Sequence, residues 1–184
     1  MAPLLEVTDL WVEFDRPDGV VHAVNGVTFS LEAGENLGIV GESGSGKTVC
    51  LLSILGLLAS NGRVLRGEAW MGETGLVQDL LQMSSRALLQ VRGKEVGFIF
   101  QDPMTSLNPI MRVGDQIVEA MLVHGLCSRV EAKARAVELL RKVGIPRPEQ
   151  RFHDYPYQFS GGMRQRVMIA IALACNPKLL IADE

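Results

Sequence analysis

The amino-acid sequence predicts an α/β fold in which a helical segment is inserted between β/α units. Three observations support this prediction. Short apolar runs typical of buried parallel strands occur at residues 37–40, 95–100 and 178–183. A glycine-rich turn stands between the first run and a helical pattern. A helical block, residues 113–143, separates the second run from the third.

Two extended segments open the chain. Residues 4–14 and 23–31 mix apolar and polar side chains, with Val, Thr and Phe prominent, and both are predicted as strands. The turn residues Asp15–Gly19 join them. After the glycine-rich turn, a helix is predicted from Thr48 to Leu58, and the turn sequence Ser60-Asn61-Gly62 ends it.

Helices dominate the second half of the chain. A short helix is predicted over residues 84–91 and a last one over residues 160–176. In the block between them, Ser128 and Glu131 have the spacing of a capping box, which marks a helix start. The apolar face predicted for that helix consists of Val130, Ala134, Val137 and Leu140.

Composition excludes several classes of protein. The 184 residues suit one domain, and a net charge of −3 with no basic block disfavours nucleic-acid binding. No apolar run is long enough to span a bilayer, and no signal peptide opens the chain. The three cysteines, Cys50, Cys127 and Cys175, have neither disulfide-framework nor metal-site spacing. We therefore expect a soluble protein of a reducing compartment.

The glycine-rich turn matches a phosphate-binding motif, GxxxxGK[ST]. Such a loop points backbone N–H groups at phosphate oxygens, and the helix N-terminus behind it favours an anion. Lys47 is expected to reach the β- and γ-phosphates, and the Thr48 hydroxyl to ligate Mg²⁺. The alternative is a chance match, but the predicted strand and helix on either side argue against it. The motif consists of Gly41, Glu42, Ser43, Gly44, Ser45, Gly46, Lys47 and Thr48.

Two carboxylates follow the last apolar run. Asp183 is expected to hold Mg²⁺ beside the nucleotide, and Glu184 to orient or deprotonate an attacking water. A solvated strand end is the alternative, and alone the commoner one. The phosphate loop earlier in the chain favours the functional interpretation.

Four motifs in order identify a family. Residues Phe159–Arg166 resemble the signature loop of ABC-type ATPases, and Phe98–Pro109 resemble their glutamine loop in the form typical of oligopeptide and dipeptide importers. Gly38–Ser43 and Arg166–Ala170 are also similar to that branch. Because the similarity covers essentially the whole chain, the chain is identified as a member of the ATP-binding subunits of oligopeptide and dipeptide importers.

The resemblance implies a P-loop NTPase core with an antiparallel β subdomain and an inserted helical subdomain. Residues 1–100 and 177–184 would form the β/α core, and residues 101–176 the helical subdomain. The chain ends at Glu184, before the switch histidine of the family, and His22, His124 and His153 all precede that point. We therefore expect a truncated domain that is inactive alone and associates through the exposed edge of its last strand.

The resemblance also implies roles for individual residues. Phe14 would stack on adenine, and Gln101 would contact Mg²⁺ and the attacking water. Ser160, Gly161 and Gly162 would touch the γ-phosphate of ATP held by a second subunit. The expected catalytic residues are thus Glu184, Gln101 and Lys47, and the expected metal ligands are Thr48, Gln101 and Asp183.

Partners follow from the same resemblance. It implies transmembrane permease subunits, a second ATPase subunit arranged head to tail, and indirectly a solute-binding protein, at the cytoplasmic face of the membrane. The docking face would lie beside Gln101 and residues 113–143. Phe159 and Met163 stand where many relatives have Leu and Gln, a variant that suits the peptide-importer branch.

Three alternatives stay open. The chain could bind a nucleotide without turnover, or serve a related importer for nickel or another solute. An ABC-type ATPase acting on nucleic acid or ribosomes is disfavoured by the charge of −3. The sequence specifies neither the imported solute nor whether the second ATPase subunit is an identical chain.

Overall fold

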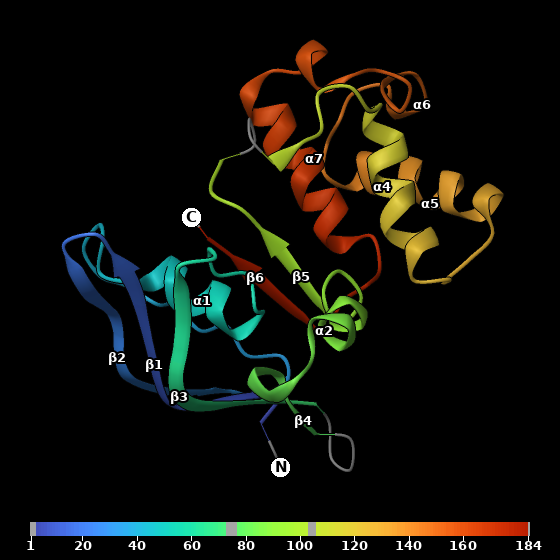
Figure 1. The fold of residues 1–184 in the computed structure, drawn as a ribbon. Helices are drawn as coiled ribbons and strands as arrows, with labels where there is room; N and C mark the ends of the chain where they lie inside the picture. Colours follow the sequence, from blue (N-terminus) through green and yellow to red (C-terminus); the bar gives the residue numbers. More distant parts are fainter. Residues whose placement is uncertain (1–2, 73–76, 103–105, 184) are drawn as a thin grey trace. The chain divides into compact units, whose positions relative to one another are not determined.

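The computed structural model describes residues 3–72, 77–102 and 106–183. They form two compact units that divide after Leu88, and each is described by itself (Figure 1). Helix α2 (Ser85–Val91) spans the dividing point. Within the described ranges, no helix has the length and apolar character required to cross a bilayer.

The first unit contains an antiparallel sheet with strand order β2-β1-β3-β4. Strands β1 (Leu5–Arg16) and β2 (Gly19–Leu31) confirm the predicted hairpin, and both continue up to its turn. The third strand, β3 (Gly62–Met71), was not predicted; it pairs with β1 and with the two-residue β4 (Gln78–Asp79).

One helix covers the sheet of this unit. Helix α1 (Lys47–Ile54) contacts β1, β2 and β3, and is followed by the one-turn helix η1 (Leu80–Gln82) later in the chain. Its buried residues Cys50 and Ile54 face a layer of strand side chains with little or no exposure to solvent. That layer includes Leu5, Val7, Leu10, Val12 and Ala69. Burial of this apolar area stabilises the hairpin and fixes α1 on the sheet.

The predicted strand at residues 37–40 is wrong in this structure. The segment has no strand assignment, and its side chains are exposed: Leu37 is 44%, Ile39 39% and Val40 92% accessible. A strand is defined by pairing with a neighbour, and no described strand pairs with this segment. An apolar run by itself therefore did not suffice to place a strand.

The second unit contains a two-stranded parallel sheet. Strand β5 (Val96–Ile99) pairs with β6 (Leu179–Ala182), and Val96 lies opposite Leu179 while Ile99 lies opposite Ala182. Both strands confirm apolar runs predicted from the sequence. Along β6 burial alternates, so that Leu179 and Ile181 are buried whereas Leu180 is 44% exposed.

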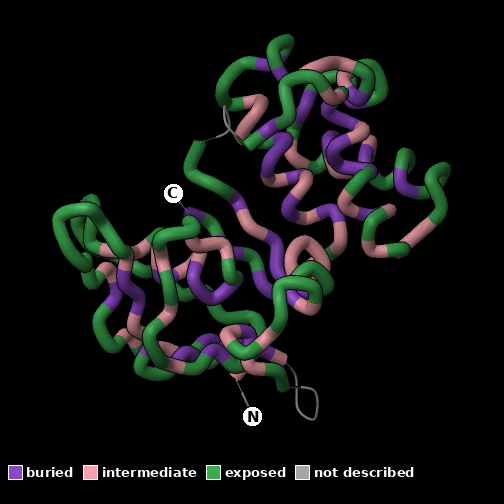
Figure 2. Tube along the Cα trace, in the orientation of Figure 1, coloured by how far each residue is buried: buried purple, intermediate pink, exposed green. Residues whose placement is uncertain are grey.

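The other described elements of this unit are helical, as predicted for residues 113–143 and 160–176. They are α4 (Val113–Val123), α5 (Arg129–Lys142), the one-turn α6 (Pro148–Arg151), the 3₁₀ turn η2 (Pro156–Gln158) and α7 (Gly161–Leu173). The Ser128 hydroxyl accepts from the Glu131 N–H, and the Glu131 carboxylate accepts from the Ser128 N–H at 2.9 Å, which confirms the capping box. Buried positions run along α4, α5 and α7 (Figure 2).

The predicted apolar face of α5 is partly wrong. Val130 is 82% exposed and Ala134 is also exposed, whereas Ala132, Ala136 and Leu140 are the buried residues. Two of these three are alanines, whose small side chains permit close approach to α4 and α7. The sequence pattern placed Val130 and Ala134 on the buried face, whereas the packing buries Ala132 and Ala136 instead.

Glycine also permits a close approach between α7 and β5. A Cβ atom added at Gly97 would lie 2.4 Å from the Ala172 carbonyl oxygen, which is backbone and cannot turn aside. Residue 97 must therefore lack a side chain for α7 to pack on the sheet at this distance. The same contact sets the position of the helix whose first turn carries the predicted signature loop.

Candidate functional site

The phosphate loop precedes α1 directly. The Ser45 N–H donates to the Glu42 carbonyl at 3.2 Å, and the Cys50 N–H donates to the Gly46 carbonyl at 2.8 Å. Gly44 and Gly46 have φ angles of 80° and 92°, a left-handed conformation that side chains disfavour. The loop is exposed from Gly41 to Ser45, so its backbone is open to solvent.

Contacts with β2 fix the end of this loop. A Cβ atom at Gly46 would lie only 2.2 Å from the Ala23 carbonyl oxygen. Ala23 is the extra residue of a β-bulge, because Val12 pairs with Val24 while Glu13 pairs with His22. The loop therefore rests on the hairpin backbone, which holds the N-terminus of α1 in place.

Lys47 folds back over the loop. Its Nζ donates to the Gly41 carbonyl at 2.8 Å and to the Glu42 carbonyl at 2.9 Å. No acidic side chain stands in the first turn of α1, so the ammonium and the helix N-terminus together favour an anion there. Burial raises the pKa of the nearby Cys50 thiol to about 11, which keeps it uncharged at neutral pH.

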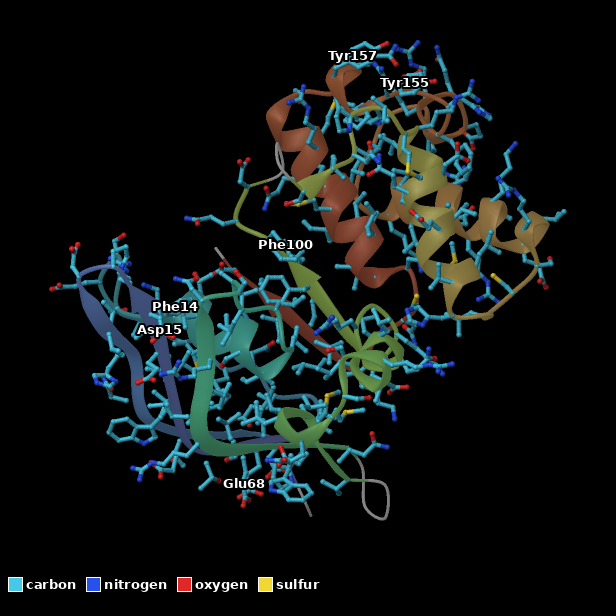
Figure 3. The ribbon with its side chains drawn as sticks, viewed as in Figure 1. Phe14, Asp15, Glu68, Phe100, Tyr155 and Tyr157 are labelled. Atoms are coloured by element: carbon cyan, nitrogen blue, oxygen red, sulfur yellow. The ribbon has the colours of Figure 1, made fainter. Side chains whose placement is uncertain are left out.

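Phe14 lies near the end of β1, beside the hairpin turn (Figure 3). It is half-buried, and its register partners are Val21 on β2 and Gly62 on β3. Val21 is two residues from Ala23, on which the phosphate loop rests. In the first unit, Phe14 and the phosphate loop therefore both lie against residues 21–23 of β2.

The second unit brings Gln101 and Asp183 to one edge of its sheet. Because Ile99 and Ala182 are partners in a parallel ladder, the residues that follow them emerge at the same carboxyl edge. The Asp183 N–H donates to the Ile99 carbonyl at 2.9 Å, and the residue is 8% exposed, whereas Gln101 is exposed. Glu184 lies outside the described residues.

Ser160, Gly161 and Gly162 form the start of α7. The Ser160 hydroxyl caps the helix by accepting from the Met163 N–H at 3.4 Å. Both glycines are exposed, and a Cβ atom at either would meet no atom within 4 Å in the part of the chain that the structure describes. Phe159 is 3% exposed, and the Arg151 guanidinium lies over its ring. The buried Phe159 side chain fixes the residue that precedes Ser160.

The predicted site residues thus fall into two sets. Phe14 and the phosphate loop from Gly41 to Thr48 belong to the first unit, and Gln101, Ser160 and Asp183 belong to the second. Sequence reasoning missed Gly62, which was treated as a helix stop although it is the register partner of Phe14. The one sequence feature that could have indicated it is a glycine at the start of residues 62–71, to which no strand was assigned.

A left-handed glycine loop, a lysine folded over it and a helix N-terminus behind it define a P-loop nucleotide-binding protein. The chain belongs to the ABC transporter family, whose model matches residues 24–184.

Curated relatives agree with this assignment. The oligopeptide transport ATP-binding protein OppD of Bacillus subtilis (strain 168) is 55% identical over 182 residues, which cover 98% of this chain and 50% of that protein. OppD of Salmonella typhimurium is 52% identical, over 98% of this chain and 52% of its own length. The dipeptide transport ATP-binding protein DppD of Lactococcus lactis subsp. cremoris is 48% identical, over 98% and 51%. The chain spans about half the length of these relatives.

Solved structures share the fold. The ATP-binding cassette MJ0796, in a dimeric post-hydrolysis state bound to ADP and Pi, matches with a TM-score of 0.83 and 27% identity. The match covers 97% of this chain and 72% of that one. A second dimeric structure of MJ0796, a bacterial ABC transporter cassette, matches equally well.

Proposed function

We propose that the chain binds ATP and that the whole protein hydrolyses it to power import of peptides across the cytoplasmic membrane. The observation that carries the binding proposal is the phosphate loop, with Lys47 held over it by the Gly41 and Glu42 carbonyls. The names of the oligopeptide and dipeptide relatives support peptides as the solute.

Nucleotide binding divides into two contacts within the first unit. Phosphate oxygens replace the loop carbonyls as partners of the Lys47 ammonium and accept from loop N–H groups. The adenine stacks on Phe14, which is half-buried and close to the loop along β2. The proposed nucleotide-binding residues are Phe14, Gly41, Ser43, Gly44, Ser45, Gly46, Lys47 and Thr48, joined by Ser160, Gly161 and Gly162 from a second subunit.

The proposed metal ligands fit Mg²⁺. Thr48, Gln101 and Asp183 offer a hydroxyl, an amide and a carboxylate oxygen, the hard donors that this ion takes together with phosphates and water. Among the described residues, no group of three or more His, Cys, Asp or Glu side chains could hold a metal alone. Bound there, Mg²⁺ would neutralise charge on the phosphates.

Hydrolysis is assigned to the carboxyl edge of β5 and β6. We propose that Glu184 orients or deprotonates the attacking water and that Gln101 helps to position it. The ladder supports a shared location for Gln101 and Asp183, because both follow the paired residues Ile99 and Ala182. The proposed catalytic residues are Glu184, Gln101 and Lys47.

A second ATPase subunit completes the proposed site. Gly161 and Gly162 cost helix stability, and among the described residues neither serves a close packing contact; this supports the approach of an outside group to that helix end. That group is the γ-phosphate of ATP on a subunit arranged head to tail. The dimeric state of the MJ0796 structures supports such an arrangement.

Permease docking is assigned to the proposed helical subdomain, residues 101–176, and not to the proposed β/α core, residues 1–100 and 177–184. Its exposed surface includes Ile110 (83% accessible) and Tyr157 (70%). Tyr157 stacks on Tyr155, with ring centroids 5.8 Å apart, and Arg112 lies over Tyr155 (Figure 3). Exposed aromatic and aliphatic side chains together are typical of protein interfaces. Docking would place the protein at the cytoplasmic face of the membrane.

Phosphate release from Mg-ATP tests the hydrolysis proposal in the whole protein. We expect turnover to fall to background in Lys47→Ala and in Glu184→Gln. Turnover that neither substitution changes would contradict the assigned site. Release at background in the unsubstituted protein would instead favour nucleotide binding without turnover.

Co-purification with the transmembrane subunits tests the docking surface. Ile110→Asp and Tyr157→Ala are expected to reduce recovery of those subunits. Leu89→Asp is the control, because Leu89 is an exposed apolar residue of α2, outside residues 101–176. Equal recovery with all three variants would place docking elsewhere.

A further inference from the structure

We propose that the turn Asn61-Gly62-Arg63 positions the Phe14 ring for the nucleotide base, and that Gly62 determines the preference for a base-bearing triphosphate. The proposal rests on the proposed function, because Phe14 has a base to contact only if the chain binds ATP. Three sets of contacts connect this turn to the end of β1.

The first contact is between Gly62 and the ring itself. A Cβ atom at Gly62 would lie 2.5 Å from Cε1, 2.9 Å from Cδ1 and 3.0 Å from Cζ of Phe14. Atoms do not approach so closely, so a methyl group at this position would displace the ring. Gly62 is not among the residues with a positive φ, and an alanine there meets no backbone strain. The lack of a side chain at Gly62 therefore leaves room for the Phe14 ring.

The second set of contacts tethers the backbone just after Phe14. The Asp15 N–H donates to the Asn61 carbonyl at 2.9 Å, and the Asn61 side-chain amide donates to the Asp15 carbonyl at 3.0 Å. Together with the register pair of Phe14 and Gly62, these bonds attach both peptide groups of Asp15 to the turn. The backbone that carries the ring is thus fixed on its C-terminal side.

The third set holds the side chains on either side of Phe14. The Arg63 guanidinium donates to Glu13, and to Asp15 at 2.6 Å. Glu13 is 6% exposed and also lies 3.4 Å from the His22 imidazole. A buried carboxylate with two partners resists displacement, since losing one would leave a buried charge less compensated. Phe14 therefore stands between two anchored neighbours.

The position of the ring relative to the phosphate loop makes this anchoring useful. Phe14 pairs with Val21, and Gly46 closely approaches Ala23, two residues further along β2. A ring fixed opposite Val21 can take a base while the loop, which rests on Ala23, takes the phosphates.

Binding of two ligands to the 184-residue chain separates base recognition from phosphate recognition. Isothermal titration with ATP and with inorganic tripolyphosphate would be performed on the unsubstituted chain, Gly62→Ala, Phe14→Ala and the double variant. Leu65→Ala is the control, because Leu65 is an exposed residue of the same strand. Stacking of a base on an aromatic ring supports an expected loss of about tenfold in ATP affinity.

We expect Gly62→Ala to weaken ATP and to leave tripolyphosphate unchanged. In the Phe14→Ala background, Gly62→Ala should cost nothing further, because the ring it displaces is gone. Should Gly62→Ala not fold, Asn61→Ala applies the same test through the lost bond to Asp15.

Three results would overturn the inference: unchanged ATP affinity in the tested variant, equal weakening of both ligands, or additive losses in the double variant. Failure of the proposed function gives a different pattern, in which the unsubstituted chain binds neither ligand.

Discussion

At the two glycines that begin α7, Gly161 and Gly162, substitution by alanine should affect stability and function in opposite directions. A Cβ atom at Gly161 or Gly162 meets no atom of the described residues within 4 Å, and neither glycine has a positive φ. Alanine stabilises a helix by about 0.5–1 kcal/mol relative to glycine, chiefly by restricting the unfolded chain. We therefore predict that Gly161→Ala and Gly162→Ala each raise the free energy of unfolding by up to about 1 kcal/mol.

The same substitutions are expected to abolish ATP-dependent association, since each methyl group would occupy the surface proposed to receive the γ-phosphate held by a second subunit. Urea unfolding gives the stability, and sedimentation velocity with and without ATP gives the association. Ser160→Ala is the informative control. It removes the bond from the Met163 N–H, so it should lose association but destabilise the chain by about 1 kcal/mol.

Opposite stability changes with the same loss of association would show that the signature loop acts between subunits. The reasoning would be refuted by destabilisation of more than about 1 kcal/mol in both glycine variants, since open space cannot produce it. Undiminished ATP-dependent association in both variants would refute the assigned contact with the partner's nucleotide.

The remaining predictions concern a loop, a packing contact and a thiol. Gly46→Ala should destabilise by about 2 kcal/mol or more in urea unfolding, because it combines a φ of 92° with a 2.2 Å approach to the Ala23 oxygen; an unchanged midpoint would contradict this. Gly97→Ala should cost about 1–3 kcal/mol by pushing α7 from β5, and a thermal melt with no shift would show that the Ala172 contact is looser than described. Cys50, with a pKa of about 11, should be alkylated by iodoacetamide far more slowly than a free thiol at pH 8, with a rate that rises about tenfold per pH unit up to pH 11. Peptide mapping by mass spectrometry checks this, and labelling at the rate of a free thiol would disprove it.

Local chemistry made much of the fold predictable. The capping box at Ser128 and Glu131 marked the start of α5 correctly, and turn residues marked the first hairpin. The phosphate loop stands directly before α1, as the motif predicts on that side. Each of these features depends on residues that are close together in the sequence, so the sequence alone reveals it.

Features that depend on distant partners were missed. Strand β3 joins β1 across more than 40 residues, and its apolar positions alternate too weakly to indicate a strand. Residues 37–40 show the reverse: a strongly apolar run with which no described strand pairs. The apolar face of α5 failed for a related reason, since the small Ala132 and Ala136 face the neighbouring helices while Val130 faces solvent. Tertiary packing decides each of these cases.

The candidate site also combines a feature set by local sequence with one set by a distant partner. The motif predicted the loop from Gly41 to Thr48, and the structure gave Lys47 its two carbonyl partners. The motif could not predict that Gly62 supports Phe14, because a pair on neighbouring strands is visible only once the strands are aligned. Pairs of this kind are where a structure adds most to a sequence.

Equilibrium binding of ATP to the 184-residue chain and to its Lys47→Ala variant tests the central claim most directly. Hydrogen bonds to charged groups contribute about 1.5–3 kcal/mol, so the account predicts saturable binding that weakens by at least about tenfold in the variant. Urea unfolding of both chains shows whether the substitution also changes the free energy of unfolding. Equal ATP affinity in the two chains, or no binding by the unsubstituted one, would contradict the account.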